Sequence, residues 1–468
     1  MKILFVGFGW PPKKGGGAIT YTYDLTKALA KNGLKIAYFY NGEVSPRPFT
    51  YLKKVKKNNV KLYKLMNSPN SYLNFSDSQK DIANKKIETI FSAVLNDFKP
   101  DIIHIQNLAG LTTEIINIAH QQKIKILLSL HNYWFICPRV DLITNKKIIC
   151  QNFTGNNCAT CVPEIKISKL KAYLQQIMEW LFQLANLLPA SLQKILLYIQ
   201  HSYQLLSPPK KSSEIVNIPK KQNREQLFQK RQEKIKEILN TKVDHCFAVS
   251  PSVKNIYMRF GIKPEKISVL TLGTQVAENI HLPAKKPQNK INFGFMGSFN
   301  PRKGINIAIE AFLKAQHNQN ADLWIYGGTR KQYEQMYGKI NTEFSNITFC
   351  GKYQHQDLKQ ILQKIDVGII PSICLETIPL TIFEFFCGKI PILGSNIGGM
   401  SNFIENNKNG LHFKVGDVQD LANKIDQIII SPQIIHAWQK NIPKIKSIDE
   451  HVQEILKIYD RIITENKN

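Results

Sequence analysis

Residues 366–395 read DVGIIPSICLETIPLTIFEFFCGKIPILGS. The runs 367–370 and 390–395 are short and apolar, as the buried strands of a parallel sheet are. Between them, Pro379 stands where a helix begins, because proline suits the first turn of a helix. A strand, a helix and a second strand in such close succession predict one unit of a parallel sheet that is covered by helices.

The same alternation of apolar runs and amphipathic segments occurs in two blocks, which predict two domains, 1–275 and 276–445. The runs expected to be strands are KILFVGF, LKIAYFY, DIIHIQN, IKILLSL and HCFAVS in the first block, and INFGFMGS, ADLWIYGG, NITFCGKY, DVGIIPS and IPILGS in the second. We therefore expect an α/β protein with two doubly wound, Rossmann-like domains that face each other across a cleft. Ligands of such sheets bind at the carboxyl ends of the strands.

The chain has 468 residues and a formal net charge of +27. Its length is too great for one ordinary domain. The charge predicts attraction to anions such as nucleotides, phosphorylated substrates and anionic lipids, or it reflects a general preference for lysine. A role in nucleic-acid binding would rest on charge alone, so we expect no nucleic-acid partner.

No stretch of about twenty uninterrupted apolar residues occurs, which argues against a membrane-spanning helix. The N-terminal MKILFVGFGW is too short for the apolar part of a secretory signal and is typical of a first buried strand. We expect a cytoplasmic protein with reduced cysteines.

The segment 165–231 breaks the alternation and predicts a helical insert in the first domain. Leucine, isoleucine and methionine recur there at helical spacing in two stripes, one before and one after Pro189. One interpretation is a helical hairpin packed on its own domain. The other is a face that rests on an anionic membrane, helped by the basic run 51–64, at the inner face of the cytoplasmic membrane.

Two glutamates, Glu376 and Glu384, lie on either side of Pro379. This places Glu376 in a loop and Glu384 in the second turn of a helix, so the two carboxylates can face different parts of one ligand. Carboxylates accept hydrogen bonds from neighbouring hydroxyls, and amides at a helix start attract a diphosphate. The alternative is a pair of surface charges, which does not explain the apolar residues around them.

Two further segments offer groups for an anion. The glycines at 15–17 follow the first strand and let the backbone approach a ligand closely, although a tight turn explains them equally well. Lys303, together with Arg302, stands at a second strand-to-helix junction, where it would clamp a phosphate or remain a solvated pair of basic residues.

Several of these segments together resemble the retaining GT-B glycosyltransferases of family 4, the group 1 glycosyl transferases. The paired glutamates match the family's E-x7-E motif within PSICLETIPLTIFEFFCGKIPILGSNIGG. The glycine loop, FGFMGSFNPRKGINIAIEAF, LLSLHNYWFICPR and NGLHFKVGDVQDLANKI match in the same order. The resemblance implies a GT-B fold, with the acceptor on the first domain, the donor on the second, and a C-terminal helix at 446–468 that crosses back to the first domain.

The resemblance also implies roles for individual residues. Glu376 would contact the transferred sugar and His131 would lie near the reacting centre, which makes them the catalytic candidates. The donor would be bound by Gly16, Gly17, Ser298, Arg302, Lys303, Pro379, Leu380, Thr381 and Glu384. Among these, Glu384 would bind the ribose and Lys303 the departing diphosphate. Without the resemblance, His131 is more simply a histidine that caps a strand end.

The chain departs from the family pattern at two positions. Ser298 stands where the family often has an arginine, and Asn402 stands where it usually has a glutamate after the glycine pair. An Asp-x-Asp metal motif is also absent from the sequence. We therefore expect no cofactor in catalysis, with protein groups alone stabilising the leaving diphosphate.

Cys137, Cys150, Cys158 and Cys161 form a C-x12-C-x7-C-x2-C pattern in the loop 137–161. Four thiols that end in a C-x2-C pair suit a tetrahedral structural zinc ion, and a similar pattern occurs in relatives of the resembled subgroup. Cysteines without a ligand, or two disulfides, are the alternatives. Four thiolates would leave no open position, so we expect no catalytic role for the metal.

These observations predict a glycosyltransferase that moves a sugar from a nucleotide-sugar donor to a saccharide or lipid-linked acceptor in the synthesis of a surface glycan. A nucleotide-sugar epimerase of the same fold is one alternative, and a protein that binds nucleotide sugars without transferring them is another.

Overall fold

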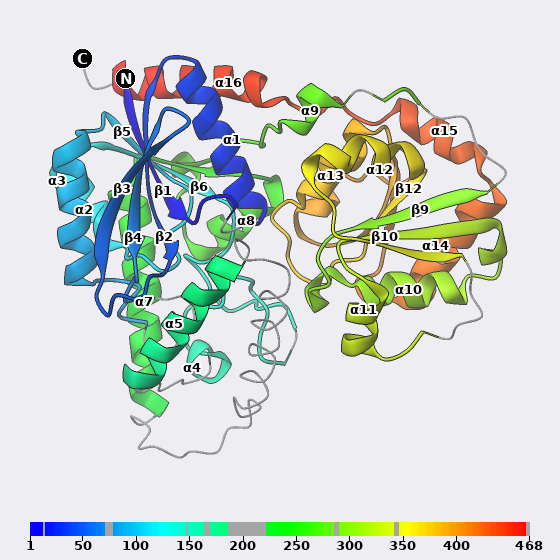
Figure 1. The fold of residues 1–468 in the computed structure, drawn as a ribbon, viewed down its shortest axis with the longest axis horizontal. Helices are drawn as coiled ribbons and strands as arrows, with labels where there is room; N and C mark the ends of the chain where they lie inside the picture. Colours follow the sequence, from blue (N-terminus) through cyan, green and yellow to red (C-terminus); the bar gives the residue numbers. More distant parts are fainter. Residues whose placement is uncertain are drawn as a thin grey trace.

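In the computed structural model, residues 1–12, 15–70, 78–146, 148–162, 169–185, 221–280, 282–284, 290–340 and 346–464 are described. Two lobes lie side by side, and each is built on its own sheet (Figure 1). In space, the first sheet has the strand order β3-β4-β2-β1-β5-β6-β7-β8 and the second β11-β10-β9-β12-β13-β14. The expected pair of doubly wound α/β domains is confirmed.

The first lobe holds the N-terminal strands and their covering helices. Its strands are β1 (Lys2–Phe8), β2 (Lys35–Glu43), β3 (Tyr51–Lys57), β4 (Val60–Met66), β5 (Ile102–Ile105), β6 (Lys125–Leu130), β7 (His245–Ala248) and β8 (Ile267–Val269). Its helices are α1 (Gly17–Lys31), α2 (Lys85–Phe98), α3 (Glu114–Gln121), α4 (Cys158–Cys161), α5 (Lys169–Ala185), α7 (Lys221–Thr241) and α8 (Pro251–Phe260). The short α9 (Val276–Asn279) leads toward the second lobe (Figure 1).

The second lobe repeats the alternation. Its strands are β9 (Ile291–Met296), β10 (Ala321–Tyr326), β11 (Ile347–Gly351), β12 (Val367–Ile370), β13 (Ile392–Ser395) and β14 (Gly410–Phe413). Its helices are α10 (Ile305–Lys314), α11 (Arg330–Tyr337), α12 (Leu358–Lys364), α13 (Leu380–Cys387), α14 (Val418–Ile430) and α15 (Gln433–Lys440), with short 3₁₀ turns η2 (Pro301–Lys303) and η5 (Gly398–Asn402). The quoted segment is thus β12, α13 and β13, and α13 begins directly after Pro379, as expected.

The strands that form the centre of each sheet are apolar because they are buried on both faces. β1 pairs in parallel with both β2 and β5, and β12 pairs in parallel with both β9 and β13. Residues 3–6 of β1 and all of β12 are buried. A parallel sheet covered by helices on both faces requires this continuous apolar pattern.

The basic run 51–64 forms a hairpin that the sequence did not predict. β3 and β4 pair antiparallel around Asn58 and Asn59, whose φ angles of 51° and 61° are in the left-handed region that asparagine tolerates. Lys54 and Lys61 both pair with Asp97 on α2, at 3.1 Å and 2.8 Å. Part of the positive charge of this run is therefore neutralised within the lobe.

The last helix, α16 (Ile448–Thr464), returns to the first lobe and packs against α1. In Figure 1 it lies across the top of that lobe, close to the N-terminus. Val452, Ile455 and Tyr459 belong to the same apolar cluster as the strands of the first sheet. The helix therefore completes the core of the first lobe, although in the sequence it comes after the whole second lobe.

The predicted helical insert is described in part. α5 carries the first apolar stripe, and Leu170 and Leu174 on this helix are exposed. The second stripe, from Leu192 to Leu206, lies outside the described residues. Tyr173 and Gln176 of α5 donate hydrogen bonds to backbone carbonyls of residues 45–47 and attach the helix to the lobe.

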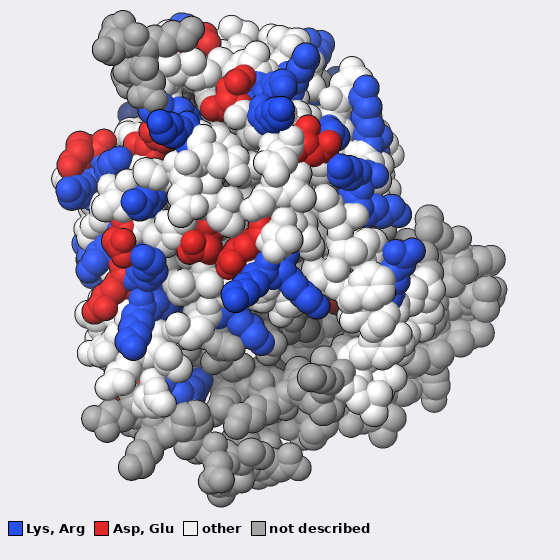
Figure 2. Space-filling view, turned by 90° about the vertical axis from the view of Figure 1, so that its left-hand side faces the viewer, with Lys and Arg blue, Asp and Glu red and all other residues white. Residues whose placement is uncertain are grey.

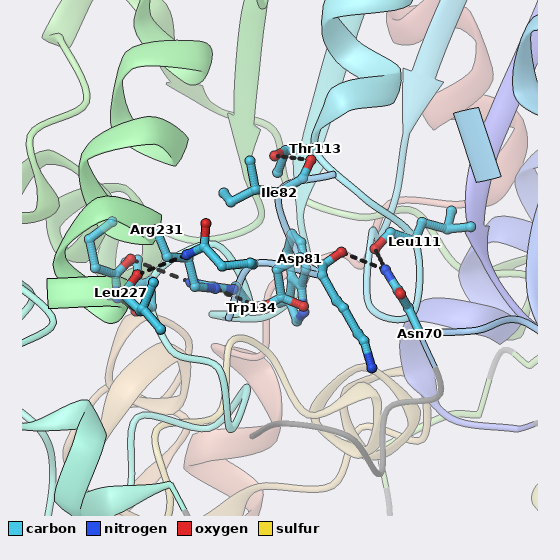
Figure 3. Close-up of polar contacts among 12 residues, drawn as sticks. Asn70, Asp81, Ile82, Leu111, Thr113, Trp134, Leu227 and Arg231 are labelled. Carbon is cyan, nitrogen blue, oxygen red and sulfur yellow. Dashed lines mark hydrogen bonds and ion pairs between the residues drawn. The ribbon is translucent and has the colours of Figure 1, made fainter. Parts of the chain in front are cut away.

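α7 is attached to the first lobe by a buried arginine (Figure 3). Arg231 is fully buried, and its Nε lies 2.6 Å from Oδ2 of Asp81. Its Nη2 donates to the carbonyl of Trp134 at 2.8 Å, and its guanidinium lies 5.0 Å from the centre of the Trp134 ring. Because a buried charge needs a partner, this pair holds α7, the segment around Asp81 and the loop after His131 in one arrangement.

In the described part of the chain, no helix is both long and apolar enough to cross a membrane. On the face that Figure 2 shows, the Lys and Arg side chains form separate groups with Asp and Glu between them. The positive charge is thus not collected into one continuous patch on that face.

We expect Asp81→Asn to destabilise the protein by about 3 kcal/mol, because it leaves the buried guanidinium of Arg231 without a countercharge. Urea denaturation would measure the change. The control is Glu405→Gln, which removes the exposed ion pair with Lys408 and should change stability by less than about 0.5 kcal/mol. Equal effects of the two substitutions would contradict a structural role for the buried pair.

Candidate functional site

The two lobes meet where β6 of the first sheet and β12 of the second end. Thr377, in the loop after β12, donates a hydrogen bond from Oγ1 to the carbonyl of His131 at 3.0 Å. Ser250, which caps the start of α8, donates from Oγ to the carbonyl of Thr377 at 3.1 Å. The loop that carries Glu376 is therefore attached to the first lobe through both the side chain and the backbone carbonyl of Thr377.

Glu376 and Lys303 form an ion pair. Lys303 Nζ lies 2.6 Å from Oε1 of Glu376, and Ser372 Oγ donates to the same oxygen at 3.1 Å. The glutamate side chain is 15% exposed and the lysine side chain is 36% exposed. The two residues come from different junctions, after β12 and at η2, so the fold brings together two groups that the sequence separates by more than seventy positions.

Glu384 lies in the second turn of α13, as predicted, where it is partly buried between the buried residues Phe383 and Phe385. Its Oε2 atom is almost completely shielded from solvent and has no hydrogen-bond partner among the described residues. Burial raises the pKa of this carboxyl group to about 7. Burial and then the charge of Glu384 raise the pKa of the Tyr353 hydroxyl, which places that ring near the glutamate. A buried acceptor without a partner is costly, so this oxygen is suited to a ligand that brings hydroxyl groups.

A pair of glycines supports the loop of Glu376. The backbone N–H of Gly399 donates to the carbonyl of Glu376 at 2.8 Å. A methyl group at Gly399 would lie 1.8 Å from the carbonyl oxygen of Thr377, and one at Gly398 would lie 2.6 Å from that of Glu376. Only glycine fits this close approach.

Asn402, where the resembled family usually has glutamate, also has a role between the lobes. Its Oδ1 accepts a hydrogen bond from the backbone N–H of Ser252 at 3.0 Å, in the first turn of α8. Ser252 in turn donates from Oγ to the carbonyl of Gly398 at 2.9 Å. The departure from the family pattern therefore supplies a helix cap in the contact between the lobes.

The glycine loop of the first lobe approaches the start of α13. A methyl group at Gly17 would lie 3.3 Å from Cγ of Leu380, and Gly16 has a φ of 122° with open space around it. Pro379 is buried, whereas Leu380 and Thr381 are partly exposed. The glycine loop of the first lobe thus lies close to the start of α13 in the second.

His131 is buried and held from two sides. Its Nε2 lies 2.7 Å from Oε1 of Gln106, and its ring centre lies 5.0 Å from that of Tyr21. Burial lowers its pKa to about 3, so the imidazole is neutral at physiological pH. Gln106 follows β5 directly, and sequence reasoning missed it although polar residues after strand ends are the ones to inspect.

Two predicted donor-binding residues lie apart from Lys303. Arg302 extends to the first lobe, where its Nη1 lies 2.7 Å from Oδ2 of Asp141 in the cysteine loop. Ser298 is exposed in the loop after β9. In this arrangement Arg302 joins the lobes rather than adding a second cation to Lys303.

The four cysteines of the loop 137–161 lie close together. Burial, and after it the neighbouring thiols Cys137, Cys150 and Cys161, raise the pKa of Cys158 to about 12, against the opposing charge of Arg231. All four are free thiols. However, no group of three or more His, Cys, Asp or Glu among the described residues is arranged to hold a metal ion. Zinc stays a prediction that metal analysis of the purified protein would test.

Two facing Rossmann-like lobes, with a C-terminal helix that returns to the first, define the GT-B fold. The chain can be superimposed on sucrose-phosphate synthase from Thermosynechococcus elongatus with a TM-score of 0.61 at 16% identity, over 99% of both chains. It can be superimposed on HepE from Anabaena, solved in complex with UDP-glucose, with a TM-score of 0.58 at 15% identity, over 98% of this chain and 100% of the other.

Residues 276–445 match the family model described as glycosyl transferases group 1. The amylovoran biosynthesis glycosyltransferase AmsK from Erwinia amylovora is 26% identical over 180 residues, which are 37% of this chain and 41% of that protein. The chain spans 40% to 48% of the length of the curated relatives that it matches. The similarity in sequence is thus to part of each relative.

Proposed function

We propose that the protein is a glycosyltransferase that moves a sugar from a nucleotide-sugar donor to a hydroxyl group of a saccharide or lipid-linked acceptor. The observation that carries this proposal is the buried Oε2 atom of Glu384, an acceptor with no partner among the described residues. Glu384 belongs to α13, whose start faces the glycine loop. The family match of residues 276–445 and the likeness to HepE, a structure with UDP-glucose, support a nucleotide sugar as the donor.

The arrangement suits the parts of such a donor. Glu384 would accept hydrogen bonds from the ribose hydroxyls, which replace the partner that its oxygen lacks. Lys303 and the first amides of α13 would bind the diphosphate. Glu376 would face the transferred sugar while it remains next to Lys303, to which it is paired.

Charge then explains the proposed reaction. The bond between the anomeric carbon and the diphosphate breaks, and its electron pair leaves with the diphosphate. The acceptor oxygen bonds to the anomeric carbon, and the proton of the acceptor hydroxyl passes to the leaving diphosphate. Positive charge develops on the anomeric carbon and negative charge on the leaving group. The carboxylate of Glu376 and the ammonium of Lys303, 2.6 Å apart, can stabilise the two charges at once.

Two finer features are part of the proposal. The E-x7-E spacing of the glutamates supports assignment to family 4 and transfer with retention of the anomeric configuration. AmsK is a glycosyltransferase of amylovoran biosynthesis, which supports an acceptor that is a growing polysaccharide.

We expect the affinity for UDP-glucose to rise between about pH 6 and pH 8, because Glu384 has a pKa of about 7 and the ionised carboxylate binds hydroxyls best. The raised pKa means that this group is largely protonated below pH 7, so affinity is lost as the pH falls. In Glu384→Gln the pH dependence should disappear, and affinity at pH 8 should drop by about tenfold.

The rise in melting temperature with UDP-glucose would measure the binding. The same measurement with a panel of nucleotide sugars would identify the preferred donor. The sugar diphosphate is a diester whose charge is constant over this pH range. Glu405→Gln, a change of an exposed glutamate in the same lobe, should behave like the natural protein. Indifference of the natural protein to every nucleotide sugar would contradict the proposal.

We expect Glu376→Ala to reduce sugar transfer by at least about a hundredfold, because it removes the charge that faces the transferred sugar. Glu376→Gln keeps the size of the side chain and separates the effect of charge from that of shape. The preferred donor should still stabilise both variants against heat, since Glu384 and the amides of α13 remain. Undiminished transfer by Glu376→Ala would show that this glutamate has been assigned wrongly.

We also propose that α5 rests on an anionic membrane surface, where a lipid-linked acceptor would be found. Leu170 and Leu174 are 69% and 48% exposed and lie one helical turn apart, and Phe49 is 50% exposed in the segment next to the residues that hold α5. Exposed leucines on one face of a helix in a basic protein suit such an interface.

We expect the double substitution Leu170→Glu and Leu174→Glu to abolish binding to vesicles of phosphatidylglycerol, because it places charge in the apolar contact. Co-sedimentation with the vesicles would measure it, with vesicles of phosphatidylcholine as the neutral comparison. Binding that is equal for the double variant and the natural protein would exclude this face.

A further inference from the structure

The helix α16 brings polar side chains into the first lobe. His451 and Tyr459 on this helix are both fully buried. His451 Nε2 lies 2.7 Å from the hydroxyl of Tyr21 on α1, and the Tyr459 hydroxyl lies 2.7 Å from Nδ1 of His104 on β5. The helix is thus joined to the lobe by two tyrosine–histidine hydrogen bonds, in one of which it supplies the histidine and in the other the tyrosine.

The first of these hydrogen bonds leads to the candidate site. The ring of Tyr21 lies between two histidines, with its centre 5.6 Å from that of His451 and 5.0 Å from that of His131. Gln106 accepts from Nε2 of His131 at 2.7 Å. The imidazole of His131 is therefore held by the hydrogen bond that it donates to Gln106 and by the ring of Tyr21.

The orientation of Tyr21 depends on His451. A buried hydroxyl group requires a hydrogen-bond partner, and His451 supplies it. The carboxylate of Glu454 lies 3.7 Å from Nδ1 of His451, which favours a proton on that nitrogen and leaves Nε2 to accept from the tyrosine. Without this acceptor the Tyr21 hydroxyl would be buried without a partner, and the ring would have to move.

We propose that Tyr21 and His451 are positioning residues for His131: His451 fixes the hydroxyl of Tyr21, and the ring of Tyr21 sets the orientation of the His131 imidazole. This inference rests on the proposed function, because it gives His131 a place in the proposed reaction. It extends the candidate site to a helix that no site motif includes and that follows the donor domain in the sequence. A small displacement of a group at a reacting centre can reduce the rate strongly.

The fold supplies a matched control. Tyr21→Phe and Tyr459→Phe each remove one hydroxyl group that forms a 2.7 Å hydrogen bond between α16 and the first lobe. Both tyrosines are buried, so both substitutions should lower the melting temperature to a similar extent. The ring of Tyr21 lies against that of His131, whereas the hydroxyl of Tyr459 is bonded to His104 instead. The comparison therefore separates positioning from stability.

The first measurement does not depend on a substrate. In protein labelled with ¹⁵N-histidine, the ring nitrogens of His131, identified by their loss in His131→Gln, report its tautomer and hydrogen bonds. We expect Tyr21→Phe and His451→Ala to shift these resonances and Tyr459→Phe to leave them unchanged. Resonances that are unchanged in Tyr21→Phe, or shifted equally in both tyrosine variants, would overturn the proposal.

The second measurement is the release of UDP from UDP-glucose. We expect Tyr21→Phe to lower kcat by about tenfold with the KM for UDP-glucose nearly unchanged, because Lys303 and Glu384, the charged residues proposed to bind the donor, lie in the other lobe. His451→Gln, whose amide can still accept from Tyr21, should restore most of the kcat that His451→Ala loses. If the natural protein is active, equal kcat values for the two tyrosine variants would contradict a positioning role.

The two measurements also distinguish this inference from the proposed function. If the natural protein neither binds nor turns over any nucleotide sugar, the proposed function fails, whereas the ¹⁵N spectra still decide whether Tyr21 and His451 orient His131. If the natural protein is active and Tyr21→Phe behaves like Tyr459→Phe, only the inference fails.

Discussion

The structure of the site depends on the short contact between Thr377 and His131. Thr377 belongs to the loop that carries Glu376, and its hydroxyl group donates to the backbone carbonyl of His131, which follows β6 in the other lobe. Ser250 and the glycine pair hold the same loop from the remaining sides. The loops that follow the strands of one sheet thus find hydrogen-bond partners in the other lobe. The catalytic candidates therefore come from two lobes, yet they are fixed by hydrogen bonds within a single connected region.

The electrostatic design of the second lobe rests on two carboxylates in different environments. Glu376 is paired with a cation and bonded to a hydroxyl group, so its charge is compensated within the protein. Glu384 lies in an apolar setting, where burial raises its pKa and leaves one oxygen without a partner. The same residue type thus serves as one half of an ion pair in the first case and as an unsatisfied acceptor in the second.

Local features of the sequence predicted the elements but not the long-range contacts. Pro379 separates a loop from a helix, so the different positions of Glu376 and Glu384 could be predicted. Gln106 could have been found from its place after a strand. The contact between Tyr21 and His451 joins residues 430 positions apart, and no local pattern indicates it. The hairpin at 51–64 was missed because its lysines concealed the alternation of apolar residues in β4.

The return of α16 to the first lobe also has a consequence for the order in which the molecule is made. Residues 448–464 leave the ribosome after the entire second lobe, but they fill the core of the first. Until then, Tyr21 and His104 lack the partners that satisfy them in the finished fold. The first lobe to be synthesised is therefore the last to be completed, and a nascent chain that stops after the second lobe would carry an exposed apolar surface along α1 for chaperones to cover.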